Sequence, residues 1–136
     1  MYIQETHIRV RYSETDQMGY MYYGNYAAFY EVGRVEMLRN LGLTYRSFEE
    51  NGIMMPVLEL QSKFIKPARY DDRITVRTIL KEIPGTRIYF EYELYNEQQE
   101  LINTGNTRLV FVDMQTNRPC KPPAGFIDLL QPYFKK

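Results

Sequence analysis

The sequence has very few of the residues that form disulfides and metal sites. Cys120 is the only cysteine and His7 the only histidine among 136 residues. A single cysteine excludes an intrachain disulfide and any multi-cysteine metal site, so we expect no metal. A cysteine nucleophile would need a histidine base, and these two residues fall in different predicted elements. We therefore interpret Cys120 as an ordinary loop residue and His7 as a side chain on a sheet surface.

The chain also lacks an excess of charge and a long apolar run. Its 17 Lys and Arg residues balance 17 Asp and Glu residues, without a basic cluster, which argues against a nucleic-acid partner. No apolar run approaches the roughly 18 residues that cross a bilayer, and the first residues do not resemble a secretion signal. We expect no membrane partner and a cytoplasmic location. The length fits a single domain over residues 1–136.

One long helix is predicted from about Asn25 to Leu41, with Asn25 as its N-cap and Gly42 as its C-cap. Apolar residues at helical spacing form one stripe, interrupted only by Arg34, and a second stripe opposite. A helix that is apolar on two sides should be covered deeply, as inside a curved sheet. The first stripe consists of Tyr26, Ala27, Tyr30, Met37, Leu38 and Leu41, and the second of Ala28, Val32 and Val35.

Alternating apolar residues predict five strands, at residues 2–12, 54–65, 73–80, 88–95 and 101–112. A short helix with Thr44 as N-cap is predicted through Glu50, and another near residues 126–130. Gly105, inside the last strand, suggests a bulge or a close approach by another backbone. One strand, a long helix and then four strands form an α+β pattern with an antiparallel sheet.

The candidate chemistry lies where the long helix begins. Asp16 lies seven residues before Tyr23, across a loop in which Gly19 can turn the chain sharply. The amides of a first helical turn are unpaired and favour negative charge. A carboxylate and a helix start can therefore face one small space. The competing interpretation is an ordinary loop aspartate, because such residues are common before helices.

Asp16 and Gly19, followed by the run from Tyr23 to Tyr26, resemble the signature of hot-dog-fold acyl-CoA thioesterases of the 4-hydroxybenzoyl-CoA thioesterase type. Residues 67–72 resemble a turn of that family, and residues 109–119 resemble its last strand and exit. The resemblance implies a five-stranded antiparallel sheet wrapped around one long central helix. It also implies a homodimer with a continuous sheet, often doubled to a homotetramer. Thirteen tyrosines and an open sheet edge likewise favour a homo-oligomer.

The resemblance also implies site residues. Asp16 would act as nucleophile or general base, because its carboxylate is charged at neutral pH, and the backbone amide of Tyr23 would polarise the thioester carbonyl. Two further roles come from the residues themselves and not from the resemblance. Asn25 would fix the start of the helix, and Lys66 and Arg69, at a strand end and the adjoining turn, are candidates for contact with the phosphates of coenzyme A. Lys63 and Arg108 are further candidates for the same contact. No cofactor is expected, since coenzyme A enters as part of the substrate.

Rival residues and rival functions remain open at the level of sequence. Another group of hot-dog thioesterases uses a glutamate on the central helix. Glu31 and Glu36 lie on this helix but are more simply paired with arginines or solvent, and Glu59 falls in a predicted strand. Related dehydratases use a histidine near this helix, which is absent here. The substrate could instead be carried by acyl carrier protein, or the protein could bind acyl-CoA without catalysis.

Overall fold

A five-stranded antiparallel sheet forms the body of the computed structural model, which describes residues 1–135. The strands are β1 (Tyr2–Arg9), β3 (Val57–Phe64), β4 (Arg73–Leu80), β5 (Arg87–Tyr95) and β6 (Leu101–Val110), in the order β1-β4-β5-β6-β3. Every neighbouring pair is antiparallel. The predicted α+β architecture is confirmed. The two sheet edges are β1 and β3.

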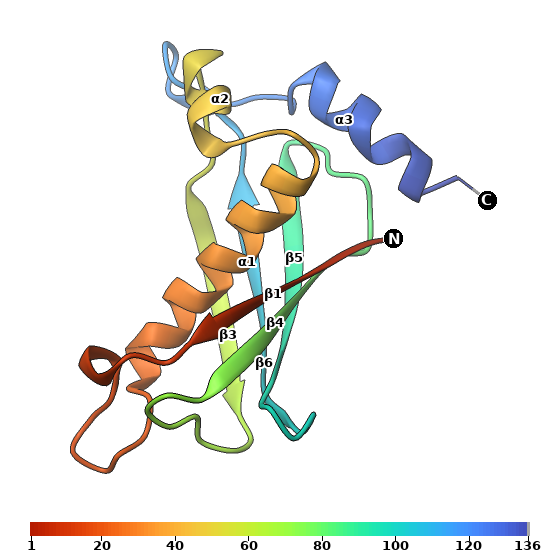
Figure 1. The fold of residues 1–136 in the computed structure, drawn as a ribbon. Coiled ribbons are helices and arrows are strands. Elements are labelled where there is room, and N and C mark those ends of the chain that lie inside the picture. Colours follow the sequence, from red (N-terminus) through yellow and green to blue (C-terminus); the bar gives the residue numbers. More distant parts are fainter. Residues whose placement is uncertain (136) are drawn as a thin grey trace.

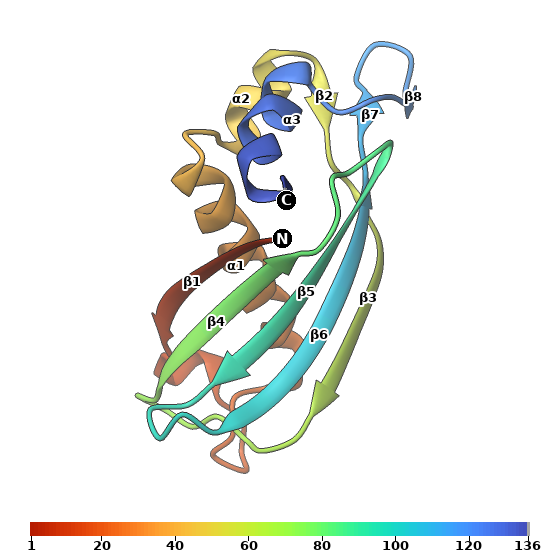
Figure 2. The same cartoon turned by 90° about the vertical axis from the view of Figure 1, so that its right-hand side faces the viewer.

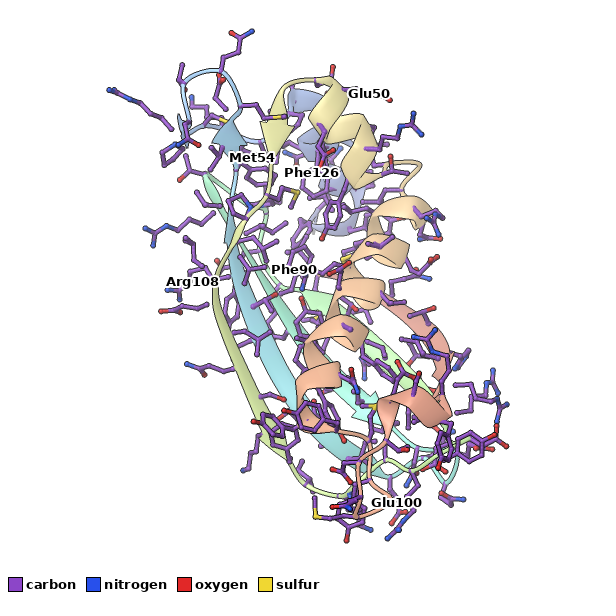
Figure 3. The ribbon with its side chains drawn as sticks, turned by 90° about the vertical axis from the view of Figure 1, so that its left-hand side faces the viewer. Glu50, Met54, Phe90, Glu100, Arg108 and Phe126 are labelled. Carbon is purple, nitrogen blue, oxygen red and sulfur yellow. The ribbon has the colours of Figure 1, made fainter. Side chains whose placement is uncertain are left out.

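The long helix α1 (Tyr26–Asn40) lies across the inner face of this sheet, which curves around it (Figure 1). A short 3-10 turn, η2 (Tyr23–Asn25), leads directly into α1. Seen from the side, the helix and the sheet form two layers, and Phe90 points from the sheet toward the helix (Figure 3). No helix among residues 1–135 is long and apolar enough to span a bilayer.

Smaller elements cover one end of the sheet (Figure 2). They are α2 (Tyr45–Glu50), α3 (Ala124–Leu130), η3 (Gln131–Tyr133) and a small sheet of β2 (Ile53–Met54), β7 (Val112–Asp113) and β8 (Arg118–Pro119). Two predicted strands are therefore divided, because their ends leave the main sheet at Pro56 and Phe111. A further 3-10 turn, η1 (Tyr12–Glu14), shortens the predicted first strand. Thr44 caps α2 as predicted, its Oγ1 accepting a hydrogen bond from the Ser47 amide at 3.0 Å.

Burial along α1 differs from the prediction. In the second apolar stripe Ala28 and Val32 are exposed and Val35 is half-buried, so this chain leaves most of that stripe uncovered; Ala27 of the first stripe is exposed as well. The sheet encloses only one face of the helix, where Phe29 and Gly33 are buried instead. Gly33 lies so close to β4 that a Cβ there would overlap the Thr78 hydroxyl.

Gly105 in β6 makes room for a side chain of the helix. The pairing of β6 runs through Gly105 without a shift, opposite Ser62 on one side and Tyr92 on the other, so the predicted bulge is absent there. The close neighbour is the Tyr30 ring of α1, which a Cβ at Gly105 would overlap. Tyr30 stacks on Tyr92 with ring centroids 4.3 Å apart and an angle of 7°. The Tyr30 hydroxyl is hydrogen-bonded to Ser62 at 2.7 Å and to Asn103.

We predict that Gly105→Ala lowers the free energy of unfolding by about 1–3 kcal/mol, because overpacking displaces the Tyr30 ring. Urea denaturation followed by circular dichroism measures this change. Gly125→Ala is the matched control, since a Cβ there meets nothing within 4 Å, and it should change stability by no more than about 1 kcal/mol. Equal effects of the two substitutions would contradict the contact between Tyr30 and Gly105.

Candidate active site

A tight loop before α1 is held by the carboxylate of Asp16. Its Oδ1 accepts hydrogen bonds from the amides of Met18 at 2.9 Å and Tyr20 at 3.2 Å. The Asp16 backbone closes the same loop, donating to the Tyr20 carbonyl at 2.8 Å and accepting from the Gly19 amide at 3.0 Å. Gly19 has φ +80°, a conformation that glycine adopts without strain. The interpretation of Asp16 as a loop aspartate is thus correct for its Oδ1 oxygen.

The second oxygen of Asp16 has a different environment. Within residues 1–135, Oδ2 takes part in no hydrogen bond or ion pair. The side chain is half-buried and lines a cavity of about 260 Å³ at the N-terminal end of α1. One carboxylate oxygen therefore fixes the loop while the other remains available for chemistry.

The start of the helix faces the same cavity, which Tyr23 also lines. In the described part of the chain, the backbone amides of Tyr23 and Gly24 donate to no acceptor, as expected for a first helical turn. The macrodipole of α1 adds a partial positive charge at this end. Asp16 and Tyr23 are thus brought to one cavity, as their spacing predicts.

The rest of the cavity is mainly apolar. Phe64 and Ile65 at the end of β3 form one wall, and Tyr26 from the first turn of α1 packs edge-on against Phe64 with centroids 4.9 Å apart. Burial raises the pKa of the Tyr26 hydroxyl. The remaining lining residues are Met18, Tyr20, Met21, Lys66 and Pro67. Sequence reasoning missed the apolar wall, because residues distant in sequence meet there only after the sheet has curved around the helix.

Asn25 does not cap the helix with its side chain, and that prediction is wrong. Its backbone is already helical, with φ −81° and ψ −13°, so its side chain cannot reach the amides of the next turn. Instead its Nδ2 donates to the Glu14 carbonyl at 2.9 Å. The same carbonyl accepts from the Tyr22 amide at 2.8 Å. Asn25 thus ties the helix start to the segment before the Asp16 loop.

The two candidate phosphate contacts differ in their surroundings. Lys66 lines the cavity and forms an ion pair with Glu100, which holds the pKa of that carboxyl below its usual range. Arg69 lies behind the rim, with its guanidinium 4.9 Å from the centre of the Tyr20 ring. The Arg69 backbone amide donates to the Asp72 carboxylate at 2.8 Å, but among residues 1–135 the guanidinium forms no ion pair. Lys66 thus lines the cavity, whereas Arg69 does not line it and instead contacts Tyr20, which does.

The rival residues lie elsewhere. Glu36 pairs with Arg39 at 2.6 Å, and Glu59 in β3 pairs with Arg108 at 3.4 Å. His7 in β1 is hydrogen-bonded to Thr75 at 3.0 Å, whereas Cys120 follows β8. Within residues 1–135, no three His, Cys, Asp or Glu side chains are grouped so that they could hold a metal.

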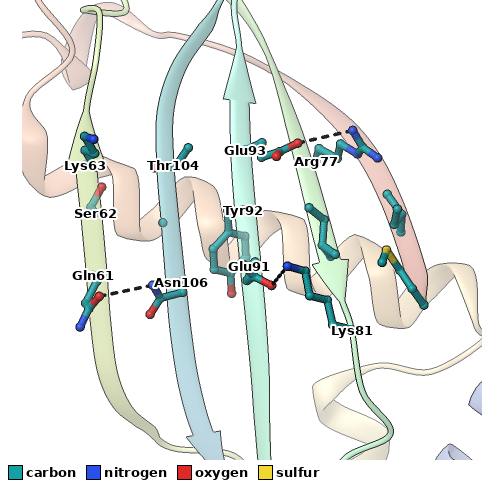
Figure 4. A pocket seen from close by; sticks show the side chains of 14 residues that line it. Gln61, Ser62, Lys63, Arg77, Lys81, Glu91, Tyr92, Glu93, Thr104 and Asn106 are labelled. Carbon is teal, nitrogen blue, oxygen red and sulfur yellow. Dashed lines mark hydrogen bonds and ion pairs between the residues drawn. The ribbon is translucent and has the colours of Figure 1, made fainter.

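Another cavity, of about 420 Å³, lies on the outer face of the sheet (Figure 4). Its charged side chains are largely paired with one another, Lys81 with Glu91 at 3.0 Å and Arg77 with Glu93 at 3.4 Å. Such pairs satisfy each other and leave little for a ligand. We therefore take the cavity beside Asp16 as the candidate active site.

The side chain of Arg34, a residue of α1, is buried, and its contacts were not predicted from the sequence. Its Nε donates to the Tyr45 hydroxyl at 2.9 Å and its Nη1 to the Tyr92 hydroxyl at 3.0 Å. The helix glutamates were expected to pair with Arg34, Arg39 or solvent; Glu36 pairs with Arg39, whereas Arg34 contacts the two tyrosines. Burial acts to lower the pKa of Arg34, but the two tyrosines more than offset it, and the pKa is raised. The guanidinium therefore remains charged.

Comparisons with known proteins agree with the fold. A model of the family "Thioesterase-like superfamily" matches residues 10–130. The chain is 32% identical to the putative acyl-CoA thioesterase YneP of Bacillus subtilis, over 99% of this chain and 98% of that protein. It is 29% identical to the acyl-CoA thioester hydrolase YbgC of Escherichia coli, over 88% of this chain and 90% of that protein.

Among solved structures, a DHNA-CoA thioesterase from Staphylococcus aureus is 35% identical and superposes with a TM-score of 0.85. The match covers 98% of this chain and 85% of that protein. This agreement confirms the predicted hot-dog architecture.

We predict that Asn25→Ala lowers the free energy of unfolding by about 1 kcal/mol, because it leaves the part-buried Glu14 carbonyl with one donor fewer. Chemical denaturation measures this. Asn106→Ala is the control, since Asn106 Nδ2 makes only a long 3.4 Å contact to Gln61 on the surface, and it should cost less than about 0.5 kcal/mol. An unchanged stability of Asn25→Ala would show that the tether contributes nothing.

Proposed function

The chain belongs to the thioesterase-like superfamily and is a thioester hydrolase, and we propose that its substrates are acyl-CoA thioesters. The observation that supports this most directly is that Asp16 and Tyr23, whose backbone amide has no acceptor within residues 1–135, line one mainly apolar cavity. A thioester presents an electrophilic carbonyl carbon and an oxygen on which negative charge develops. The cavity supplies a group for each.

In the proposed mechanism the carbonyl oxygen of the thioester accepts a hydrogen bond from the Tyr23 amide. Asp16 Oδ2 then attacks the carbonyl carbon or takes a proton from a water molecule that attacks it. The C–S bond breaks, and the thiolate of coenzyme A takes a proton that comes from water, directly or through Asp16. When Asp16 attacks the carbon itself, the resulting acyl-aspartate anhydride is then hydrolysed by water, which releases the carboxylic acid and restores the carboxylate. Both routes use the same carboxylate oxygen. Hydrolysis changes no oxidation state, so we propose that it proceeds without a cofactor.

The roles of the polar residues around the cavity follow from their positions. Lys66 at the rim and Arg69 behind Tyr20 are proposed to meet phosphates of coenzyme A as it leaves the apolar cavity. Lys66 would have to exchange its ion pair with Glu100 for the ligand, which is feasible at an exposed site where such pairs contribute little. Asn25 is proposed to act indirectly, by holding the helix start in register with the Asp16 loop.

A second copy of the chain is proposed to complete the site. The edge strand β3 has no strand beyond it in the described chain, and its inward side chains Leu58, Leu60 and Phe64 are 43–51% exposed. An apolar edge of this kind invites pairing with another strand. Pairing β3 with its counterpart would cover these side chains and close the cavity wall at Phe64. The assembly is proposed to be a homodimer or a homotetramer built from it.

The activity is tested by following release of free thiol with a thiol-reactive dye, over acyl-CoAs from acetyl to palmitoyl and benzoyl-type thioesters. Rapid release from a subset supports the proposal and ranks the acyl groups. If none reacts, the same acyl groups are offered on acyl carrier protein, which is the alternative substrate. Binding of acyl-CoA without hydrolysis of either thioester would point to a non-catalytic binding protein.

We predict that Asp16→Asn lowers kcat at least 100-fold while the Kd for an acyl-CoA changes less than about threefold. The asparagine Oδ1 still accepts from the Met18 and Tyr20 amides, so the loop is retained and only the charged oxygen is lost. Asp71→Asn is the matched control, because Asp71 is an exposed loop aspartate whose carboxylate faces Arg9 at 3.9 Å. Near-normal turnover of Asp16→Asn would refute the mechanism.

We also predict that Leu60→Lys shifts the protein toward the monomer, because it places a charge in the proposed strand interface. Sedimentation velocity measures the mass. Leu129→Lys is the matched control, since Leu129 on α3 is 40% exposed against 43% for Leu60 but lies away from the β3 edge. An unchanged mass of Leu60→Lys, or the same loss for both variants, would exclude β3 as the interface.

A further inference from the structure

Arg34 is a buried cation that the proposed reaction does not use. Its exposed fraction is 5%, although Glu31 before it and Arg39 after it on α1 are both exposed. The guanidinium has five N–H donors, and its two hydrogen bonds go to the hydroxyls of Tyr45 and Tyr92. Within residues 1–135 no carboxylate forms an ion pair with it, and its Nη2 group donates to no acceptor.

The two tyrosines do not neutralise this charge. Burial raises the pKa of Tyr92 to about 12, and burial also raises the pKa of Tyr45. Both hydroxyls are therefore uncharged at neutral pH. A buried cation without an anion is costly, and proteins usually pair such groups or place them against a ligand.

The guanidinium lines a pocket of about 250 Å³ between α1, α2 and the segment that joins β2 to β3. This pocket shares no lining residue with the cavity beside Asp16. Figure 3 places Met54 beside α2, at the end of the molecule opposite Glu100. Apart from Arg34 and Tyr45, the walls consist of Phe48, Ile53, Met54, Met55 and Val57, with Glu31 and Glu49 completing the lining.

The two glutamates restrict which anion fits. Both are exposed, so solvent and salt screen their charge more than that of the buried guanidinium. They still disfavour a multiply charged anion such as a phosphate group at the mouth. A molecule with one carboxylate and an apolar body fits both parts of the pocket: the carboxylate accepts hydrogen bonds from the guanidinium, and the apolar body packs against the apolar walls.

We propose that the Arg34 pocket binds a monocarboxylate, with its carboxylate on the Arg34 guanidinium and its hydrocarbon part against Met54, Met55 and Phe48. A free carboxylic acid, the class to which the product of thioester hydrolysis belongs, has this chemistry. The link to turnover rests on the proposed function, but the binding site itself does not.

Isothermal titration of the protein with hexanoate tests the site. We expect one hexanoate bound per chain, and at least tenfold weaker binding of hexanamide, which has the same shape without the charge. Arg34→Met should weaken hexanoate binding at least tenfold. Met54→Trp should do the same by filling the pocket while leaving both hydrogen bonds of Arg34 in place, so the test does not depend on whether Arg34→Met folds. Met114→Trp is the matched control, because Met114 is exposed and lies outside the pocket.

The absence of hexanoate binding to the unmodified protein would overturn the proposal. Binding that survives Met54→Trp, or equal binding of hexanamide, would overturn it as well.

Discussion

The close seating of α1 on the sheet determines the rest of the structure. Two glycines permit it, Gly33 on the helix above Thr78 and Gly105 on β6 beneath the Tyr30 ring. The closeness has a cost, because the buried Thr78 hydroxyl finds no hydrogen-bond partner in the described chain. It is offset by the stacking of Tyr30 on Tyr92 and by the hydrogen bonds of both hydroxyls. This packing fixes the position of the first turn of the helix and holds Arg34 in contact with Tyr92 of β5.

Asp16 has a structural role in its loop and a proposed chemical role in the same side chain. Because Oδ1 accepts two backbone hydrogen bonds, the carboxylate cannot rotate freely, and the position of Oδ2 is fixed as well. Fixing a reacting group before the substrate arrives removes an entropic cost from the reaction. A loop aspartate and a catalytic aspartate are therefore compatible interpretations of this residue. They would be separated by substitution with asparagine, which preserves the first role and removes the second.

Local patterns in the sequence predicted the elements well, and failed where distant residues meet. Residues 73–80 alternate strictly and form β4 over the same range. The Asp16 and Tyr23 spacing placed both residues at one cavity because only a short loop separates them. The prediction that the Asn25 side chain caps the helix failed because the 3-10 turn Tyr23–Asn25 already makes its backbone helical. Arg34 appeared to interrupt an apolar stripe, and its tyrosine partners, 11 and 58 residues away, could not be foreseen from helical spacing.

The polarity of the Asp16 cavity matches the two halves of an acyl-CoA. Its inner walls are formed by Phe64, Ile65 and Tyr26, which suit a hydrocarbon or aromatic acyl group. Lys66 and, beyond it, Arg69 lie at the outer side, where the phosphates of coenzyme A would emerge. The thioester carbonyl joins these halves and would fall between them, beside Asp16 and the helix start. A substrate bound by both ends would thereby be aligned for attack at its centre, and the wall at Phe64, which a second copy is proposed to close, would limit the size of the acyl group.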